Sequence, residues 1–386
     1  MTQPAAAGAP APGSILCVVG ARPNFMKIAP VMAALRAVLG PARVRLLHTG
    51  QHYDALMNQQ YFDALGIPAP DVNLEVGSAS HAVQTAEIMR RFEPVLDAEG
   101  PAAVLVVGDV NSTLACALVA SKKSVPVIHV EAGLRSYDRA MPEEINRVLT
   151  DRLSDLLFTT ERGARENLER EGIDPARVHF VGNVMIDTLR QNLKHAVPVR
   201  ETLGAAADAV AGGYAALTLH RPSNVDDAPV LKALLGAVRE VSARLPVVFA
   251  VHPRTREKIA QFGLQPLLDG PRIVQTPPLG YLQMLGLMRD ARVVLTDSGG
   301  IQEETTALGV PCITLRNNTE RPITAEEGTN TVVGQDPARI LAVVDEILRT
   351  GGRAGRIPDM WDGAASQRIA AVISRWLDSG AERKVA

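Results

Sequence analysis

Four carboxylates in the first half of the sequence lie where they could act as the acid and base of a proton-transfer reaction. Asp109 and Glu131 each come at the end of an aliphatic run, in "AAVLVVGD" and "VPVIHVE". An ionised group there is costly unless it has a partner or opens into a cleft. Glu143 and Glu144 follow a proline in "MPEEINR", and they also fit first-turn acids that favour a helix dipole. Carboxylates converging on one cleft would supply both acid and base.

A candidate phosphate site lies in the second half, in "TDSGGIQEE" (residues 296–304). A strand that leads through serine and two glycines into a helix exposes backbone N–H groups at the positive end of the helix. Glu303 and Glu304 lie about one turn further on, where a carboxylate could accept hydrogen bonds from sugar hydroxyls. The same stretch also fits a simple N-cap with a glycine turn.

Cationic side chains follow the first apolar run, in "GARPNFMK". This segment lacks the G-x-G-x-x-G spacing of a dinucleotide fingerprint. Arg22 and Lys27 fit solvated charges, but their position at the end of a buried strand favours an anionic partner. Further polar residues follow the other expected strands: Gln51, His52, His129, His220, Arg221, His252, Arg254, Asp297 and Ser298.

The elements that must position these residues are short apolar runs that alternate with helical patterns. Continuous apolar strands separated by helices are typical of parallel sheets covered on both faces. Strands are expected at 14–20, 43–49, 102–108, 125–130, 154–160, 177–183, 214–220, 245–252, 271–275, 292–297, 310–315 and 331–334. The predicted fold is therefore α/β, with two Rossmann-like doubly wound domains facing a central cleft.

The domain boundaries follow from the weak pattern around residues 192–213. The prediction is a disordered tail at 1–13, an N-terminal domain at 14–190 and a C-terminal domain at 191–364. A final helix should span 365–386, with Ile369, Val372, Ile373 and Trp376 on one face, and dock back on the first domain. In open sheets of this kind, ligands bind beyond the carboxyl ends of the strands.

Bulk properties favour a small ligand. The chain has 386 residues, 46% of them apolar, and a net charge of −2. Binding to nucleic acid or a membrane surface is normally driven by a basic excess, so neither partner is expected. Metal-ligand spacing is absent from the sequence, so no metal or other cofactor is predicted. Three cysteines in aliphatic surroundings and the lack of a long apolar run suggest a reducing, cytoplasmic setting.

The motifs taken together closely resemble the non-hydrolysing UDP-N-acetylglucosamine 2-epimerases. Nine of them occur in family order from about residue 14 to residue 335: "GARPNFMKIAP", "TGQHYD", "GDVNSTLA", "HVEAGLRS", "MPEEINR", "VGNVMIDTL", "HRPSN", "TDSGGIQEE" and "NTERPIT". The resemblance implies the glycosyltransferase-B architecture, with the nucleotide held mainly by the second domain. It also implies a UDP-sugar as substrate and a homodimer.

The resemblance also implies roles for individual residues. Those that match positions around the diphosphate are Arg22, His220, Ser298, Gly299, Gly300 and Arg321, and Glu304 matches the carboxylate on the uridine ribose. Polar residues that match the catalytic set around the sugar are Lys27, Asp109, Glu131 and Glu143, and His220 is counted with them. Gln51 and His52 match positions that help to bind a second, activating UDP-N-acetylglucosamine in bacterial members.

The family reaction explains this combination of groups. The hydrogen on C2 of the hexosamine is not next to a carbonyl, so its direct removal would give a poorly stabilised carbanion. The family eliminates UDP to form 2-acetamidoglucal and adds UDP back with protonation on the opposite face of C2. A clamp on the departing diphosphate is then part of catalysis, and carboxylates must remove one proton and deliver another.

Three departures from the common family pattern leave other substrates and activities open. Tyr53 stands where an arginine is frequent, "HRPSN" replaces H-R-x-E-N, and Met284 stands where an aromatic residue is common. The first two affect the region associated with the activator. "GARPNF" and "MPEEINR" also resemble the branch that epimerises UDP-2,3-diacetamido uronic acids. The remaining alternatives are a glycosyltransferase of the same architecture, a hydrolysing epimerase and a catalytically silent nucleotide-sugar sensor.

Overall fold

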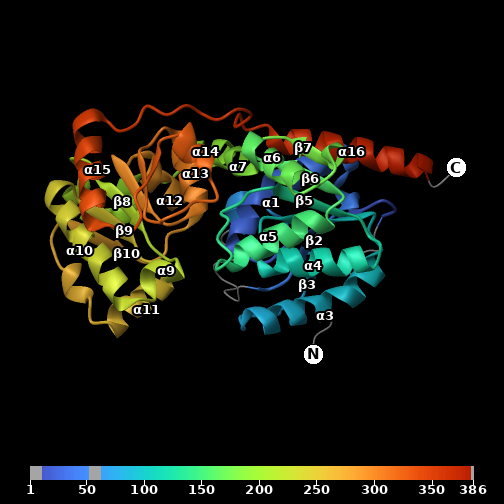
Figure 1. Cartoon of the computed structure of the whole chain (residues 1–386), viewed down its shortest axis with the longest axis horizontal. Helices are drawn as coiled ribbons and strands as arrows, with labels where there is room; N and C mark the ends of the chain where they lie inside the picture. The colour runs from blue at the N-terminus through green and yellow to red at the C-terminus, as the bar shows by residue number, and fades with distance from the viewer. Residues whose placement is uncertain (1–10, 52–61, 384–386) are drawn as a thin grey trace. The chain divides into compact units, whose positions relative to one another are not determined.

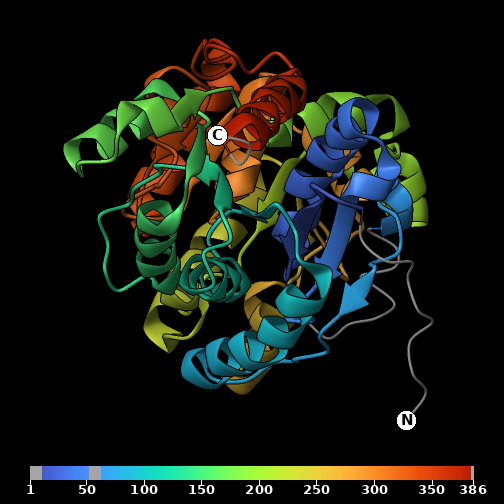
Figure 2. The same cartoon turned by 90° about the vertical axis from the view of Figure 1, so that its right-hand side faces the viewer.

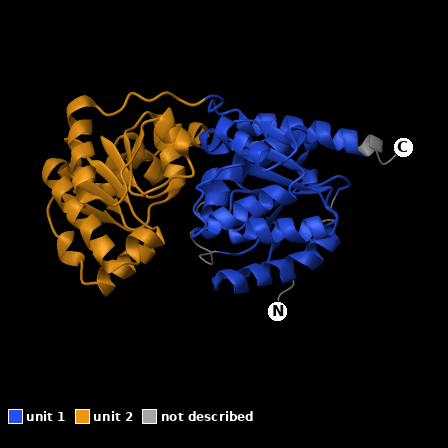
Figure 3. Ribbon diagram, in the orientation of Figure 1, with its two compact units in different colours: residues 1–188, 359–386 blue, residues 189–358 orange. Residues whose placement is uncertain are grey.

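The chain forms two compact units, and its computed structural model describes residues 11–51 and 62–383 (Figure 1). Unit 1 comprises Met1–Thr188 and Asp359–Ala386, and unit 2 comprises Leu189–Pro358 (Figure 3). The boundaries predicted from the sequence, after residues 190 and 364, lie a few residues further along the chain. Each unit has its own sheet.

Unit 1 is built on a seven-stranded parallel sheet with the order β3-β2-β1-β4-β5-β6-β7. Its strands are β1 (Ile15–Val19), β2 (Val44–His48), β3 (Val72–Asn73), β4 (Ala103–Val107), β5 (Val127–Ala132), β6 (Leu156–Thr159) and β7 (Val178–Phe180). Its helices are α1 (Arg22–Leu39), α3 (His81–Glu99), α4 (Asn111–Lys122), α5 (Pro142–Leu153), α6 (Arg162–Arg170) and α16 (Ala365–Arg383), and α7 (Val184–Asn192) crosses into unit 2. The strand order reverses between β1 and β4, which makes their carboxyl ends the expected ligand site.

Both faces of this sheet are buried, which explains the continuous apolar runs. Ile15 and Cys17 of β1 belong to the core that includes residues of α1 and α16. Leu16 and Val18, which point to the opposite face, belong to the core that includes residues of α3 and α4. Successive strand residues therefore serve two different cores.

The C-terminal helix α16 packs against α1 within unit 1 (Figure 1; Figure 2). Ile369 and Ile373 are fully buried in the same core as α1, so the apolar face predicted from the sequence is confirmed. Asp187 fixes the start of the helix by accepting hydrogen bonds from the backbone N–H groups of Ala365 at 3.1 Å and Ser366 at 2.7 Å.

Unit 2 has a six-stranded parallel sheet with the order β10-β9-β8-β11-β12-β13. Its strands are β8 (Ala215–Thr218), β9 (Val247–Ala250), β10 (Ile273–Thr276), β11 (Val293–Thr296), β12 (Cys312–Thr314) and β13 (Asn330–Val332). Its helices are α8 (Val199–Leu203), α9 (Pro222–Val225), α10 (Ala228–Arg244), α11 (Pro253–Gln261), α12 (Tyr281–Arg289), α13 (Gly299–Leu308), α14 (Pro322–Glu326) and α15 (Pro337–Thr350). Here the order reverses between β8 and β11.

Every strand expected from the sequence is present, and β3 is an additional one. This strand has only two residues, Val72 and Asn73, so no apolar run marks it. Cys17, Cys116 and Cys312 are buried with free thiols. Burial raises the pKa of the Cys17 thiol to about 12, which makes it a core residue and not a nucleophile. Within the described residues, no helix is both long and apolar enough to cross a membrane.

Candidate active site

The carboxyl end of β5 carries a predicted catalytic acid, and α1 places a lysine beside it. Glu131 forms an ion pair with Lys27, and both side chains are buried. Asn24 anchors the first turn of α1. Its side-chain oxygen accepts a hydrogen bond from Gly20 N–H at 3.1 Å, and its amide group donates to the Val107 carbonyl at 3.0 Å. The first turn of α1 is thereby held to the end of β4.

The backbone around this ion pair is unusual at two positions. Glu131 has a φ of +74°, and the register of β5 with β6 shifts between Val130 and Ala132. A non-glycine residue in the left-handed region costs about 1–3 kcal/mol and is typical of functional sites. Gly108 follows β4 with a φ of +67°, and a Cβ there would lie 2.9 Å from Lys27 Nζ. The positive φ favours glycine at this position, and any larger residue would also displace the end of Lys27.

Asp109 and Glu144 of α5 are connected through Arg147. Arg147 donates from Nε to Asp109 Oδ2 at 3.1 Å and from Nη1 to Glu144 Oε2 at 2.7 Å. Glu144 also accepts the backbone N–H of Tyr137 at 2.8 Å, so its carboxylate holds the loop before α5. Glu143 is half-buried in the first turn of α5, and Asp109 also keeps part of its side chain exposed. The two predicted acids Asp109 and Glu143 can therefore meet a substrate.

Two other predicted residues lie on elements next to this group. Arg22 is the first residue of α1. Gln51 is buried, and its side-chain oxygen accepts hydrogen bonds from the N–H and Oγ of Ser112, at 3.2 and 2.7 Å. His52 lies outside the described residues. Gln51 is thus held by the first turn of α4, directly after the β4 strand end.

In unit 2, a buried carboxylate positions His220. Asp297 follows β11 and accepts hydrogen bonds from the backbone N–H groups of His220 and Arg221, both at 2.9 Å, and from Asn224 Nδ2 at 3.0 Å. Its other oxygen lies 2.8 Å from His220 Nδ1. Burial alone would raise the pKa of Asp297, but the charge and hydrogen bonds of His220 and the Arg221 N–H lower it to about 2. The ionised carboxylate therefore orients the imidazole, which remains partly exposed.

The glycine motif forms the start of α13, as the phosphate prediction requires. Gly299 is the first helical residue and Ser298 is the N-cap, whose hydroxyl makes no capping hydrogen bond to the described backbone. A Cβ at Gly299 would lie 2.6 Å from Glu320 Oε1. A simple N-cap would accept a hydrogen bond from a backbone N–H of α13 with its hydroxyl oxygen, and Ser298 makes no such hydrogen bond within the described residues. The first N–H groups of a helix lack partners within it, so this end can bind an anion.

Arginines and acids alternate beside this helix start. Arg321 Nε lies 2.6 Å from Glu303 Oε1, and Arg316 Nη2 lies 2.7 Å from Glu320 Oε2. Burial would raise the pKa of Glu320, but Arg316 and Arg321 hold it far below its usual range. Arg221 lies 3.5 Å from the same carboxylate. Three guanidinium groups therefore lie beside these two carboxylates at the start of α13.

The neighbouring acid, Glu304, has a different environment. It is buried, and its Oε1 accepts a hydrogen bond from the Tyr281 hydroxyl at 3.0 Å. Burial raises the pKa of Glu304 to about 8, and the charge of Glu303 adds to this, although the Tyr281 hydrogen bond opposes it. Of the two adjacent acids predicted to face sugar hydroxyls, Glu303 therefore forms an ion pair with Arg321, and Glu304 accepts a hydrogen bond from the neutral Tyr281 hydroxyl.

Comparison with known proteins establishes the family. The sequence profile of UDP-N-acetylglucosamine 2-epimerases matches residues 40–374. The chain belongs to the UDP-N-acetylglucosamine 2-epimerase family. An epimerase of this name from Methanocaldococcus jannaschii is 41% identical over 362 residues, which cover 92% of this chain and 98% of that protein. The UDP-2,3-diacetamido-2,3-dideoxy-D-glucuronate 2-epimerase of Pseudomonas aeruginosa is 40% identical over 94% of this chain and 99% of its own length.

A solved structure extends the likeness to three dimensions. The M. jannaschii enzyme in complex with UDP-GlcNAc and UDP has a TM-score of 0.85 and 40% identity, covering 94% of this chain and 99% of that one. The predicted family, isomerase class and two-domain α/β glycosyltransferase-B architecture are confirmed. The roles of individual residues stay predictions, although the structure brings Lys27, Glu131 and Asp109 to adjacent strand ends of unit 1.

Two residues that contact the candidate site residues were not predicted from the sequence. Arg147 is the last residue of "MPEEINR", and no function was predicted for it, although it donates a hydrogen bond to Asp109. Its spacing of three residues from Glu144 on a helix was the available signal. Tyr281 contacts Glu304 from a different helix, so no local spacing pointed to it.

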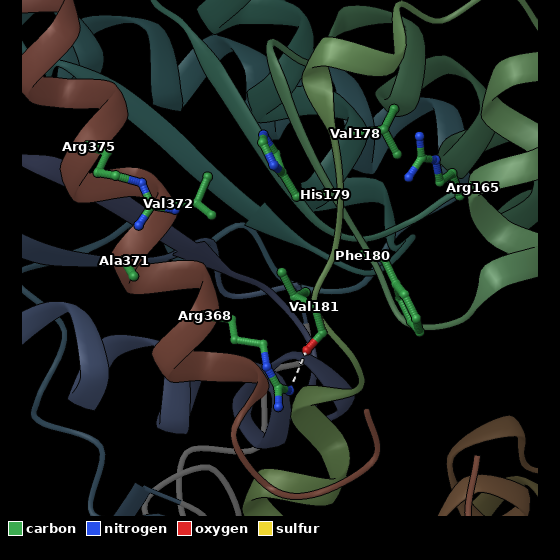
Figure 4. Close-up of a pocket in the computed structure, with 9 residues that line it drawn as sticks. All are labelled: Arg165, Val178, His179, Phe180, Val181, Arg368, Ala371, Val372 and Arg375. Carbon is green, nitrogen blue, oxygen red and sulfur yellow. Dashed lines mark hydrogen bonds between the residues drawn. The ribbon is translucent and has the colours of Figure 1, made fainter. Parts of the chain in front are cut away.

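A separate pocket of about 510 Å³ lies at the edge strand β7 of unit 1 (Figure 4). Arg368 and Arg375 reach it from α16, and Arg165 reaches it from α6. Arg368 donates a hydrogen bond at 3.0 Å to the carbonyl of Val181, the residue that follows β7. The residues that line this pocket are different from those predicted for the epimerase site.

The environment of Glu304 predicts a pH-dependent stability. Because its pKa of about 8 lies above the ordinary 4.5, its stabilising contribution is present below pH 4.5 and is lost as the pH rises through 8. We expect the wild-type unfolding free energy to fall by about 3 kcal/mol more than that of Glu304→Gln between pH 5 and 8. Urea unfolding measures this difference. Equal pH profiles for the two proteins would contradict it.

Proposed function

We propose that this chain is a non-hydrolysing epimerase that interconverts UDP-N-acetylglucosamine and UDP-N-acetylmannosamine. The observation that carries the proposal is the buried Lys27–Glu131 ion pair next to Asp109, in a chain of this family. A reaction at C2 needs groups that exchange protons, and this cluster contains them. The substrate belongs to the class named for the M. jannaschii structure, which holds UDP-GlcNAc and UDP.

The proposed reaction has two halves. In the first, the C1–O bond to UDP breaks and a carboxylate takes the C2 proton, which leaves 2-acetamidoglucal. In the second, UDP re-forms the C1–O bond and an acid protonates the opposite face of C2. Asp109, Glu131 and Glu143 share these proton transfers in our assignment. Lys27 is the cationic partner of Glu131 in this group.

The leaving diphosphate needs hydrogen-bond donors and positive groups whose interactions with it become stronger as its negative charge develops. In our assignment the groups that unit 2 supplies are the N–H groups of Gly299 and Gly300, the Ser298 hydroxyl, His220 and Arg321. Glu304 would accept a hydrogen bond from a ribose hydroxyl. Because the pKa of Glu304 is raised to about 8, its carboxyl group is protonated near neutral pH before UDP binds. It either keeps this proton in the complex or releases it when the ribose binds.

Other properties of the enzyme are proposed on the family resemblance. The protein would act in the cytoplasm as a homodimer. Exposed Ile145 and Leu149, four residues apart on α5, supply an apolar stripe that supports association. Gln51 and His52 would contribute to a second nucleotide-sugar site.

A second substrate class is supported by a specific observation. The P. aeruginosa relative, named for a UDP-2,3-diacetamido glucuronate, matches this chain over nearly its whole length. That sugar undergoes the same chemistry at C2, so the same acids would serve. Substrate identity therefore depends on groups that contact C3 and C6 of the sugar.

Proton NMR of the purified protein with UDP-N-acetylglucosamine in D2O tests the proposal. We expect new UDP-N-acetylmannosamine signals, with deuterium at C2 of both epimers. Turnover of only the diacetamido uronic acid nucleotide would move the assignment to the second substrate class. Accumulation of UDP and free sugar would indicate a hydrolysing enzyme, and reaction only with an added acceptor would indicate a glycosyltransferase.

A further inference from the structure

A fully buried histidine and aspartate in unit 1 have no part in the reaction proposed above. His129 lies in the middle of β5 and Asp151 lies on α5, and each has 0% exposure. His129 Nδ1 lies 2.7 Å from Asp151 Oδ1, and Nε2 lies 2.8 Å from the Gly108 carbonyl oxygen. Both ring nitrogens therefore have short contacts to oxygen.

The partners determine where the protons lie. A carbonyl oxygen can only accept, so Nε2 carries a hydrogen that it donates to Gly108. Asp151 Oδ2 accepts hydrogen bonds from Gly133 N–H at 3.1 Å and from Arg135 Nη1, which lies 2.8 Å away. Those donors favour the ionised carboxylate, and an ionised Oδ1 requires a second ring proton on Nδ1. The geometry therefore points to a second ring hydrogen, on Nδ1, that His129 donates to Asp151.

The surrounding charges agree with this protonation. Arg135 also forms an ion pair with Glu171, with Nη2 and Oε2 2.7 Å apart. The four groups then carry two positive and two negative charges, so the interior has no net charge to solvate. With a neutral ring protonated only on Nδ1, the lone pair of Nε2 would instead face the Gly108 oxygen at 2.8 Å.

The pair links the two strand ends that carry the acids. Gly108 precedes Asp109, and its peptide is held twice by β5: the N–H donates to the Val130 carbonyl at 3.1 Å, and the carbonyl accepts from His129. On the other side, Asp151 accepts the N–H of Gly133, two residues after Glu131. One α5 carboxylate is therefore bonded, directly or through the imidazolium, to both backbone segments.

We propose that His129 and Asp151 are positioning residues that set the separation of Asp109 and Glu131. Neither side chain needs to touch the substrate. A buried ion pair need not stabilise the fold, since replacing it with well-packed apolar residues of similar volume often leaves the unfolding free energy unchanged or raises it. The contacts here instead fix a backbone geometry, and a displacement of about 1 Å between reacting groups can cost on the order of 100-fold in rate. The catalytic part of this proposal rests on the proposed epimerase function.

The protonation state is tested first, and without activity. Protein labelled with nitrogen-15 in histidine should show one imidazolium near neutral pH with hydrogens on both ring nitrogens. His129→Gln should remove this signal. Assignment of a neutral ring to His129 in the folded wild-type protein would overturn the imidazolium.

Turnover of three variants tests the positioning role. His129→Gln and Asp151→Ala should lower kcat per UDP-binding site by about 30- to 100-fold, with UDP affinity and KM within about twofold. Asp151→Asn can still accept from Gly133 through its oxygen, and a neutral ring can still donate from Nε2 to Gly108. It should therefore lose less than about tenfold in kcat.

Asp187→Asn is the matched control, because Asp187 is also a buried carboxylate of unit 1 but caps α16. It should lower the unfolding free energy and leave kcat per UDP-binding site unchanged. Equal kcat per site in His129→Gln and wild type, or an equal loss in Asp187→Asn, would overturn the positioning role. If wild-type protein turned over no nucleotide sugar, the proposed function would fail, while the ring signals would still decide the protonation.

Discussion

Glu131→Gln is expected to fold and to bind UDP normally, but to lose about 100- to 10,000-fold in kcat, the range typical of a lost general acid or base. The amide keeps the shape of the side chain but cannot take a proton from C2. It also removes the anionic partner of Lys27. UDP affinity should stay within about threefold, since our diphosphate contacts involve other residues. Steady-state kinetics and UDP calorimetry measure both quantities.

Glu166→Gln is a suitable control, because Glu166 is an exposed acid on α6 of the same unit. It should match the wild-type protein in kcat and in UDP affinity. Asp109→Asn should resemble Glu131→Gln, although its effect includes the loss of charge beside Arg147. Normal turnover in both Asp109→Asn and Glu131→Gln would remove these residues from the mechanism.

Asp297→Asn is expected to lower the unfolding free energy by about 2–4 kcal/mol and to weaken UDP binding at least about tenfold. The carboxylate accepts hydrogen bonds from two backbone N–H groups and Asn224, and it pairs with His220. The NH2 group of asparagine would face either the imidazole or the N–H groups that now donate to the carboxylate. His220 would then lose its fixed orientation. Urea unfolding and UDP calorimetry give the two values.

The pH dependence of this effect has a definite sign. The pKa of Asp297 is lowered to about 2 from an ordinary 3.8, so its contribution to stability is present above pH 3.8 and is lost as the pH falls through 2. The difference in unfolding free energy between the wild-type protein and Asp297→Asn should therefore be larger at pH 5 than at pH 2. Asp227→Asn, at the exposed N-cap of α10, is the control and should change little, because asparagine caps equally well. Unchanged UDP affinity in Asp297→Asn would show that His220 needs no such orientation.

The local sequence was sufficient to predict most helices and strands, and the positions at which polar residues follow the strands. Apolar runs marked twelve strands, and helical spacing marked the buried face of α16. These signals are local, because a side chain in a strand or helix repeats its direction every few residues. The strand β3 was not predicted, because two residues are too few to show the periodicity of a strand.

Local sequence did not determine which neighbouring acids share an environment. Glu303 and Glu304 are adjacent, yet one contacts Arg321 and the other contacts Tyr281. Likewise, Glu143 and Glu144 follow the same proline, but Glu144 is buried and accepts hydrogen bonds from the Tyr137 N–H and Arg147, whereas Glu143 is half-buried. Helix geometry points consecutive side chains about 100° apart, so their partners come from distant segments.

The sequence by itself thus determined the family, the α/β alternation, and the residue types that follow each strand. Only the tertiary structure showed that Lys27 pairs with Glu131, that Asp297 orients His220, and that Asp151 connects the backbones beside Asp109 and Glu131 through His129. The physical reason is that charge and burial act through space. The ionisation of a carboxylate depends on the dielectric and the donors within a few ångströms, and those are supplied by packing.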